Sequence, residues 1–174
     1  MNKKITTLIS ITLSTLILSG CVTPQKETTV IKAQTAIYVK PMSFILNVHD
    51  LSVRAVRKEI LKKAVAGIGV PYVFSGMSRN GWDCSGFTAY VYGEVGIQLE
   101  HSATKQAHTA KPTRKPQAGD IVAFSRGDAY WYYHVGIYLG DGKIVDANSY
   151  YGRTLVEPIT NYKGDKITFI DVIE

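Results

Sequence analysis

The sequence predicts an α+β domain, with helices at its N-terminal end and an antiparallel β-sheet after them. Apolar residues recur at helical spacing in residues 51–68, and a second capped helix start lies at residues 83–92. Residues 121–173 instead alternate with a period of two between glycine-bearing turns, which is typical of strands that pair with their sequence neighbours. With 174 residues, of which 45% are hydrophobic and 20% charged, the chain is long enough for one core.

Residues 1–20 have the layout of a secretory signal, because Lys3 and Lys4 precede an uncharged apolar run. This run is shorter than the about 20 residues that a membrane-spanning helix needs. It ends in Leu18-Ser19-Gly20-Cys21, which resembles the lipobox of bacterial lipoproteins, where the cysteine is acylated and becomes the new N-terminus. We therefore expect Cys21 to carry a lipid anchor. The alternative is an ordinary signal peptide that ends in an incidental cysteine.

Residues 21–50 are of mixed composition, and we interpret them as the lipid anchor and a tether to a domain at residues 51–174. Val22 follows the expected acylated cysteine in place of the aspartate that is associated with inner-membrane retention. The expected location is therefore the cell envelope, at an outer membrane and facing the periplasm if the host has one.

The first helix is expected to begin after Asp50, because an aspartate side chain is a good N-cap. Apolar residues follow at helical spacing, namely Val53, Val56, Ile60, Ala64 and Ile68. Gly67 and Gly69 mark the end of this helix, and Pro71 cannot continue it. The second helix is predicted to start at Asp83, with Cys84 in its first turn. Five strands are predicted after it, at 121–124, 133–139, 143–147, 154–156 and 167–173.

The chain contains two cysteines, and if Cys21 carries lipid, no disulfide can form within the mature chain. Cys84 is then the single thiol of an exported protein, and it is either a small buried hydrophobic residue or a residue kept for its chemistry. Unpaired N–H groups at a helix N-terminus favour a thiolate and can also hold an oxyanion. Cys84 is therefore a candidate nucleophile.

A nucleophilic cysteine needs a base, and His134 is the best placed of the four histidines because it begins a clear strand. Alternation puts Val135, Ile137 and Leu139 on the core face, and His134, Gly136 and Tyr138 on the other face. The small Gly136 leaves room for a helix or a substrate to approach. The alternative is that His134 has only a structural role.

The turn at 140–142 sends the chain back along the histidine strand, and Asp146 and Asn148 share the face of His134 by parity. A three-residue loop sets position 148 opposite His134, whereas a tighter or shifted register brings position 146 there. Either side chain can hold the second ring nitrogen of the imidazole, and either can instead be a solvated residue on an edge strand.

Four motifs in order resemble the NlpC family of cell-wall cysteine peptidases, from about Glu59 to the C-terminus. They are Pro71-Tyr72-Val73-Phe74, Asp83-Cys84-Ser85-Gly86-Phe87, Ala118-Gly119-Asp120-Ile121-Val122 and His134-Val135-Gly136-Ile137-Tyr138-Leu139-Gly140. The resemblance implies a papain-like fold and hydrolysis of peptide bonds in peptidoglycan stems, commonly next to γ-D-glutamate. It implies no metal and no cofactor.

Carried over to this chain, the resemblance implies that Cys84 is the nucleophile, His134 the base and Asp146 the third polar member of the site. It also implies that Tyr72 lines the nucleophile, and that Asp83 and Ser85 recognise the substrate's amino group. A carboxylate and a hydroxyl suit an ammonium group. The chain departs from the family pattern at two places. The third position is more usually His, Asn or Gln, and His101, in Glu100-His101-Ser102, stands where an arginine often precedes the Ser or Thr.

The expected partners are peptidoglycan and, through lipidated Cys21, a membrane. The net charge of +6 favours anionic surroundings, but the basic residues are scattered, and we expect no nucleic-acid partner. No zinc-type cysteine pairs and no glycine-rich phosphate loop occur in the sequence. Two other functions remain open, a catalytically weak wall-binding or assembly lipoprotein and an acyl transferase on the same scaffold.

Overall fold

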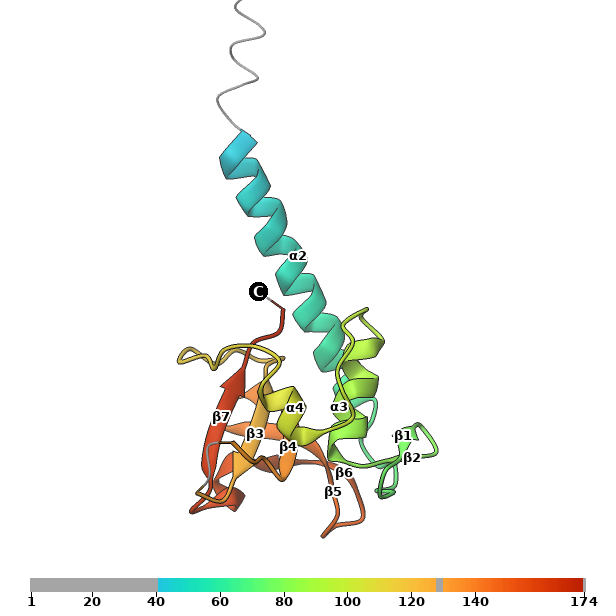
Figure 1. Ribbon diagram of the computed structural model, residues 1–174. Helices are drawn as coiled ribbons and strands as arrows, with labels where there is room; N and C mark the ends of the chain where they lie inside the picture. Colours follow the sequence, from blue (N-terminus) through green and yellow to red (C-terminus); the bar gives the residue numbers. More distant parts are fainter. Residues whose placement is uncertain (1–40, 128–129, 174) are drawn as a thin grey trace, which may run out of the picture. The chain divides into compact units, whose positions relative to one another are not determined.

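The computed structural model describes residues 41–127 and 130–173 (Figure 1). The N-terminal part of the fold is helical: α2 spans Pro41–Val65, α3 spans Cys84–Gly93 and the short α4 spans Ala103–Ala107. A two-residue pair of strands, β1 (Met77–Ser78) and β2 (Gly81–Trp82), lies between α2 and α3. The expected signal peptide, Cys21 and most of the expected tether lie outside the described residues.

The C-terminal part is a five-stranded antiparallel sheet. Its strands are β3 (Ile121–Ser125), β4 (His134–Gly140), β5 (Lys143–Asn148), β6 (Arg153–Pro158) and β7 (Lys166–Ile170), and a 3₁₀ helix, η1 (Ile159–Tyr162), connects β6 to β7. The order in the sheet is β6-β5-β4-β3-β7, so the last strand returns to pair with β3. The predicted α+β class with helices packed on an antiparallel sheet is confirmed.

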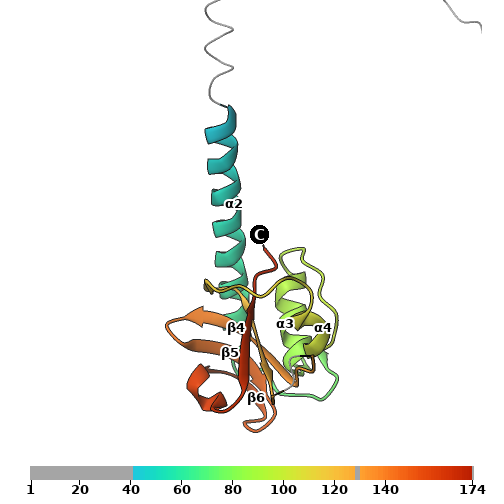
Figure 2. The same cartoon turned by 60° about the vertical axis from the view of Figure 1, so that its left-hand side comes forward.

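Both faces of this sheet are covered. On one face, side chains of α2, α3 and α4 pack with the strands in the larger core, and α3 and α4 lie on the same side of the sheet in both views (Figures 1 and 2). The predicted core face of β4, with Val135, Ile137 and Leu139, belongs to this core. The other face carries a smaller core around Val122, Phe124 and Ile144, to which η1 contributes. The His134 face of β4 is therefore buried as well.

Helix α2 starts earlier than its sequence pattern suggested. It begins at Pro41, so Asp50 lies inside the helix, and the prediction that Asp50 is its N-cap is wrong. Proline is favoured in the first turn of a helix, where a missing N–H costs nothing. The Asp50 carboxylate instead pairs with Arg54 one turn later, at 3.1 Å. Ten residues that we interpreted as tether are thus helical.

Helix α3 starts as predicted. Asp83 is its N-cap, and its carboxylate accepts a hydrogen bond of 2.7 Å from the backbone N–H of Gly86. Phe87, Val91 and Tyr92 are fully buried in the larger core, where α3 packs on β4 and β5. This packing holds the first residue of α3, Cys84, toward the start of β4. Among the described residues, no helix has the length and apolar character needed to span a membrane.

Candidate active site

Cys84 is the first residue of α3, and it is partly exposed. Tyr72 lies near it, in the segment that leads from α2 to β1. The pKa of the Tyr72 hydroxyl is raised by burial and by the neighbouring Cys84 and Asp83. The tyrosine that the resemblance assigns to the nucleophile therefore lies at the nucleophile.

His134 is the first residue of β4 and only 9% exposed. Its Nε2 lies 2.7 Å from Oδ2 of Asp146, and its ring also interacts with Cys84. Burial lowers the pKa of His134, but the hydrogen bonds with Asp146 and Cys84 and the charges of both groups raise it to about 10. The imidazole is thus held between the thiol and a buried carboxylate. The three residues expected to be catalytic come together in space.

The strand register explains why Asp146 reaches the imidazole. Strands β4 and β5 pair Ile137 with Val145 and Tyr138 with Ile144, and the same register continued places Asn148 opposite His134. Asp146 reaches His134 diagonally across the strand pair. The register expected for a three-residue loop, with position 148 opposite His134, is therefore the one that forms, and the choice of Asp146 as the partner of His134 agrees with the geometry.

Gly136 makes this diagonal contact possible. It lies beside Asp146, and a Cβ atom at Gly136 would come within 3.0 Å of the Asp146 Cβ. The missing side chain leaves space for the carboxylate to lean toward His134. Asn148 bonds instead to neighbouring polar groups: its Nδ2 donates to Oε1 of Glu157 at 2.8 Å and to the hydroxyl of Tyr162 at 3.3 Å.

Tyr162 and Glu157 extend the site, and neither was predicted from the sequence. The Tyr162 hydroxyl donates toward Oδ2 of Asp146 at 3.1 Å and toward Oε1 of Glu157 at 2.9 Å. Burial raises the pKa of Asp146 and Glu157 raises it further, while the hydrogen bonds from His134 and Tyr162 act in the opposite direction. Tyr162 follows Asp146 by 16 positions and stands in a 3₁₀ turn, so no strand or helix period pointed to it.

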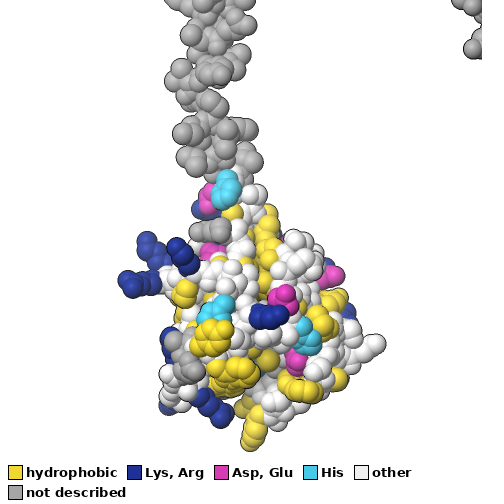
Figure 3. Space-filling model, in the orientation of Figure 1, with side chains coloured by type: hydrophobic (Ala, Val, Ile, Leu, Met, Phe, Trp, Pro, Cys, Tyr) yellow, Lys and Arg dark blue, Asp and Glu magenta, His cyan; other side chains and the backbone are white. Residues whose placement is uncertain are grey.

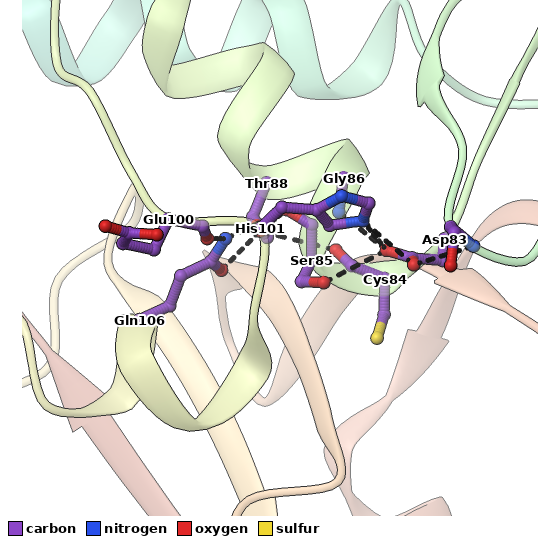
Figure 4. A network of polar contacts seen from close by, with 9 residues as sticks. Asp83, Cys84, Ser85, Gly86, Thr88, Glu100, His101 and Gln106 are labelled. Carbon is purple, nitrogen blue, oxygen red and sulfur yellow. Dashed lines mark hydrogen bonds and ion pairs between the residues drawn. The ribbon is translucent and has the colours of Figure 1, made fainter.

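A second polar cluster adjoins Cys84 at the start of α3 (Figure 4). Oδ1 of Asp83 accepts from the Ser85 hydroxyl at 3.0 Å, and Nε2 of His101 lies 2.9 Å from both carboxylate oxygens. Burial raises the pKa of Asp83, but hydrogen bonds from Gly86, His101 and Ser85 outweigh it and lower the pKa overall. Asp83 and Ser85 therefore adjoin the nucleophile, and His101 supplies the charge partner of Asp83.

Gln106 of α4 fixes the position of this cluster (Figure 4). Its Nε2 donates to the backbone carbonyls of Ser85 and Glu100, at 2.9 and 2.7 Å, and its Oε1 accepts from the Thr88 hydroxyl at 2.5 Å. The buried amide thus ties α3 to the loop that carries His101. In the part of the chain that the structure describes, no three His, Cys, Asp or Glu side chains gather to hold a metal ion.

The fold and the site define an α+β protein whose cysteine, at a helix N-terminus, faces a strand histidine and its carboxylate partner. The model of the NlpC/P60 family matches residues 69–170, and the chain belongs to this family. It is 36% identical over 109 residues to the "probable endopeptidase p60" of Listeria grayi, covering 62% of this chain and 21% of that protein. It is 39% identical over 84 residues to a "probable endopeptidase" of Haemophilus influenzae, covering 47% of this chain and 52% of that protein. The match thus spans about a fifth to a half of these relatives.

Solved structures agree with the assignment. The peptidoglycan hydrolase RipB of Mycobacterium tuberculosis superposes with a TM-score of 0.62 at 25% identity, over 71% of this chain and 68% of that one. The NlpC/p60 domain of the peptidoglycan hydrolase SagA superposes with a TM-score of 0.59 at 28% identity, over 66% of this chain and 98% of that one. RipD of Mycobacterium tuberculosis, described as a non-catalytic NlpC/p60 protein adapted to peptidoglycan binding, shares the fold with a TM-score of 0.57 at 19% identity, over 67% and 97%. The papain-like fold is confirmed, and the family includes members without catalysis.

Proposed function

We propose that this protein is a cysteine endopeptidase that hydrolyses peptide bonds in peptidoglycan stem peptides. The observation that carries the proposal is the row of Cys84, His134 and Asp146, in which the imidazole interacts with the thiol and lies 2.7 Å from a buried carboxylate. Such a row supplies a nucleophile, a proton carrier and a group that orients it. Relatives named endopeptidases and neighbours named peptidoglycan hydrolases support the bond type and the polymer.

The chemistry proceeds through a thioester. The Cys84 thiolate attacks the amide carbonyl, and N–H groups at the start of α3 stabilise the oxyanion. The protonated imidazole of His134 gives its proton to the leaving amine, and the C–N bond breaks. His134 then takes a proton from water, and the hydroxide attacks the thioester and releases the acid and the Cys84 thiolate, which restores the thiolate and the imidazolium. Asp146 stabilises the imidazolium in the first half of this cycle.

The substrate's free amino group is assigned to Asp83 and Ser85. The Asp83 carboxylate keeps a lowered pKa and so stays charged at neutral pH, which suits an ammonium ion. Its side chain remains 12% exposed and that of His101 23% exposed, so a ligand can reach both. We extend the proposal to cleavage next to γ-D-glutamate, as in the family that the motifs resemble.

Digestion of purified peptidoglycan, with mass spectrometry of the released fragments, tests the proposal. The wild type is expected to release muropeptide fragments cut within the stem, and Cys84→Ala to release none while melting near the wild type. Pelleting of both proteins with insoluble peptidoglycan separates the wall-binding alternative, for which RipD is the precedent. Binding by both proteins with cleavage by neither would replace the endopeptidase with a binding protein. Products joined to an added amine instead of water would indicate the acyl transferase.

We also propose that Cys21 is lipidated and anchors the domain to the membrane of the cell envelope, most simply the outer membrane. The basic start, the short apolar run and the four residues that end in Cys21 support this. More than one acyl chain is needed for stable anchoring, and Cys21 is placed to carry them. Cys21→Ser is expected to move the protein from the membrane pellet to the soluble fraction. Equal amounts of both forms in the pellet would refute this anchor.

A further inference from the structure

Tyr162 contacts both members of the buried histidine–carboxylate pair. Its ring stacks on the imidazole of His134 with centroids 5.4 Å apart and planes inclined by 15°. The Tyr162 ring also stacks on Phe124, with centroids 3.9 Å apart and planes inclined by 24°. Its hydroxyl lies 3.1 Å from Oδ2 of Asp146, the same oxygen that His134 contacts. One side chain thus touches the base through its ring and the carboxylate through its hydroxyl.

The hydroxyl of Tyr162 has one hydrogen and two carboxylate acceptors. Oε1 of Glu157 lies at 2.9 Å and Oδ2 of Asp146 at 3.1 Å. Nδ2 of Asn148 donates to the tyrosine oxygen and to Glu157, so the hydroxyl hydrogen is directed toward the carboxylates. Burial and the two carboxylates raise the pKa of Tyr162, which therefore remains a donor throughout the working range of the site.

The carboxylate of Asp146 depends on these donors. It is fully buried, and its Oδ1 has no hydrogen-bond partner among the residues that the structure describes. Both donors, His134 and Tyr162, meet at Oδ2. A buried carboxylate that is fixed at one oxygen by a single neighbour can rotate about that contact, whereas two donors at different angles define its orientation.

We propose that Tyr162 is a positioning residue of the active site, which fixes the Asp146 carboxylate through its hydroxyl and the His134 imidazole through its ring. This inference rests on the proposed peptidase function. Tyr162 acts through Asp146 and His134 and does not touch the substrate. Its hydroxyl also shares the charge of Asp146, so the carboxylate stabilises the imidazolium less than it otherwise would. If Tyr162 only filled space in the smaller core, its ring would be enough and its hydroxyl would have no effect on the site.

Tyr162→Phe separates these roles, because it removes the hydroxyl and keeps the ring. The matched control is Tyr133→Phe. Tyr133 also has its ring near His134, with centroids 6.3 Å apart, but its hydroxyl donates to Asp165, away from Asp146. We expect Tyr162→Phe to lower kcat by about tenfold with little change in KM, the size of effect that one hydrogen bond to a charged group can have. Tyr133→Phe should remain near the wild type.

The pH dependence gives a readout that packing alone would not change. The titratable groups around His134 and its partner Asp146 are those of Cys84, Tyr162, Tyr133 and Glu157. Without the Tyr162 hydroxyl, Asp146 should hold the imidazolium more strongly. The alkaline limb of kcat/KM should then move to higher pH in Tyr162→Phe, and the His134 ring should titrate at higher pH by nuclear magnetic resonance. Neither should move in Tyr133→Phe.

A double-mutant cycle tests whether the hydroxyl acts through Asp146. In an Asp146→Asn background, adding Tyr162→Phe should change kcat by less than about twofold, because the carboxylate that it orients is gone. The same tenfold loss in both backgrounds would overturn the proposal. A Tyr162→Phe variant with the kcat and the His134 titration of the wild type would also overturn the proposal. So would a Tyr162→Phe chain that does not fold, because the hydroxyl would then have a structural role. If the wild type does not cleave peptidoglycan, the proposed function fails, and the His134 titration still decides the positioning role.

Discussion

At the scale of single residues, the chain departs from its family most clearly at His101. Where the family often has a permanently charged arginine, a histidine lies 2.9 Å from both oxygens of Asp83. A histidine offers this carboxylate a ring nitrogen instead of the planar fork of N–H donors that arginine presents. Asp83 is the N-cap of α3 as well as the proposed ammonium site, so His101 influences both helix stability and substrate binding.

His101→Gln is expected to raise the pKa of Asp83, because His101 is one of the groups that lower it. A carboxyl group with a lowered folded-state pKa stabilises the fold above its unfolded pKa, near 3.8 for Asp83, and this stabilisation is lost as the pH falls through the folded value. In the variant, the Asp83 carboxyl group should therefore stabilise the fold less at neutral pH, and the loss of thermal stability on acidification should be smaller and complete at a higher pH. Melting curves from neutral to acidic pH check this, and superimposable pH profiles of the two proteins would contradict it.

Asp146 and Asn148 form a natural comparison, because both lie on the His134 face of β5 and only Asp146 contacts the imidazole. Asp146→Ala should lower turnover by roughly one to several orders of magnitude, since about 1.4 kcal/mol corresponds to tenfold. Asn148→Ala should be mild, because the side-chain hydrogen bonds of Asn148 go to Glu157, Tyr162 and its own turn rather than to the imidazole. Turnover of both variants on one peptidoglycan substrate, after matched melting curves, is the measurement. A crippled Asn148→Ala beside a nearly normal Asp146→Ala would reverse the assignment.

At the scale of elements, the spacing of apolar residues and the positions of turn residues predicted the second helix and all five strands of the large sheet. Residues in these strands alternate with a period of two, and glycines mark the turns between them. The start of α2 was missed because an aspartate before an apolar run is also compatible with a helix interior. The contact of Asp146 with His134 depends on a diagonal reach past Gly136, which strand parity alone does not specify. Tyr162 reaches the site from a 3₁₀ turn, where no period exists.

The first turn of α3 packs too closely for a side chain at Gly86. A Cβ there would lie 2.0 Å from the backbone oxygen of Gly76, whereas a Cβ at Gly93, in the same helix, would meet nothing within 4 Å. Gly86→Ala should therefore displace the N-terminus of α3 and lower both the melting temperature and the activity. Gly93→Ala should be neutral or stabilise by up to about 1 kcal/mol. Thermal melts of the pair measure the contrast, and equal melting temperatures would show that the first turn has more room than the structure indicates.

At the scale of the whole molecule, the site is built from segments far apart in sequence, and the helices must be held on the sheet for Cys84 to meet His134. Apolar packing in the larger core supplies most of this. The charge distribution adds no single recognition surface on the face shown in Figure 3, where lysine and arginine side chains lie at several separate places. The net charge of +6 is therefore compatible with general attraction to anionic surroundings.

Arg57 joins α2 to the rest of the domain through a buried ion cluster. Its guanidinium lies 2.6 Å from Oδ1 of Asp120, at the start of β3, and also pairs with Asp171 beyond β7. Its side chain is only 8% exposed, whereas that of Arg54, three residues earlier, is 73% exposed and pairs with Asp50 on the helix surface. The same residue type on the same helix thus makes a buried and an exposed ion pair.

Arg57→Met keeps much of the side-chain volume but leaves two carboxylates without their cation. Removing one partner of a buried ion pair costs about 3–5 kcal/mol, whereas an exposed pair contributes at most about 1 kcal/mol. Arg57→Met should therefore be strongly destabilised in urea unfolding, and Arg54→Met should unfold close to the wild type. Because burial already raises the pKa of Asp120, its carboxyl group should take up a proton more readily in Arg57→Met, so the variant should regain part of its stability at mildly acidic pH. Equal unfolding midpoints for the two variants would mean that apolar packing alone holds α2 on the domain.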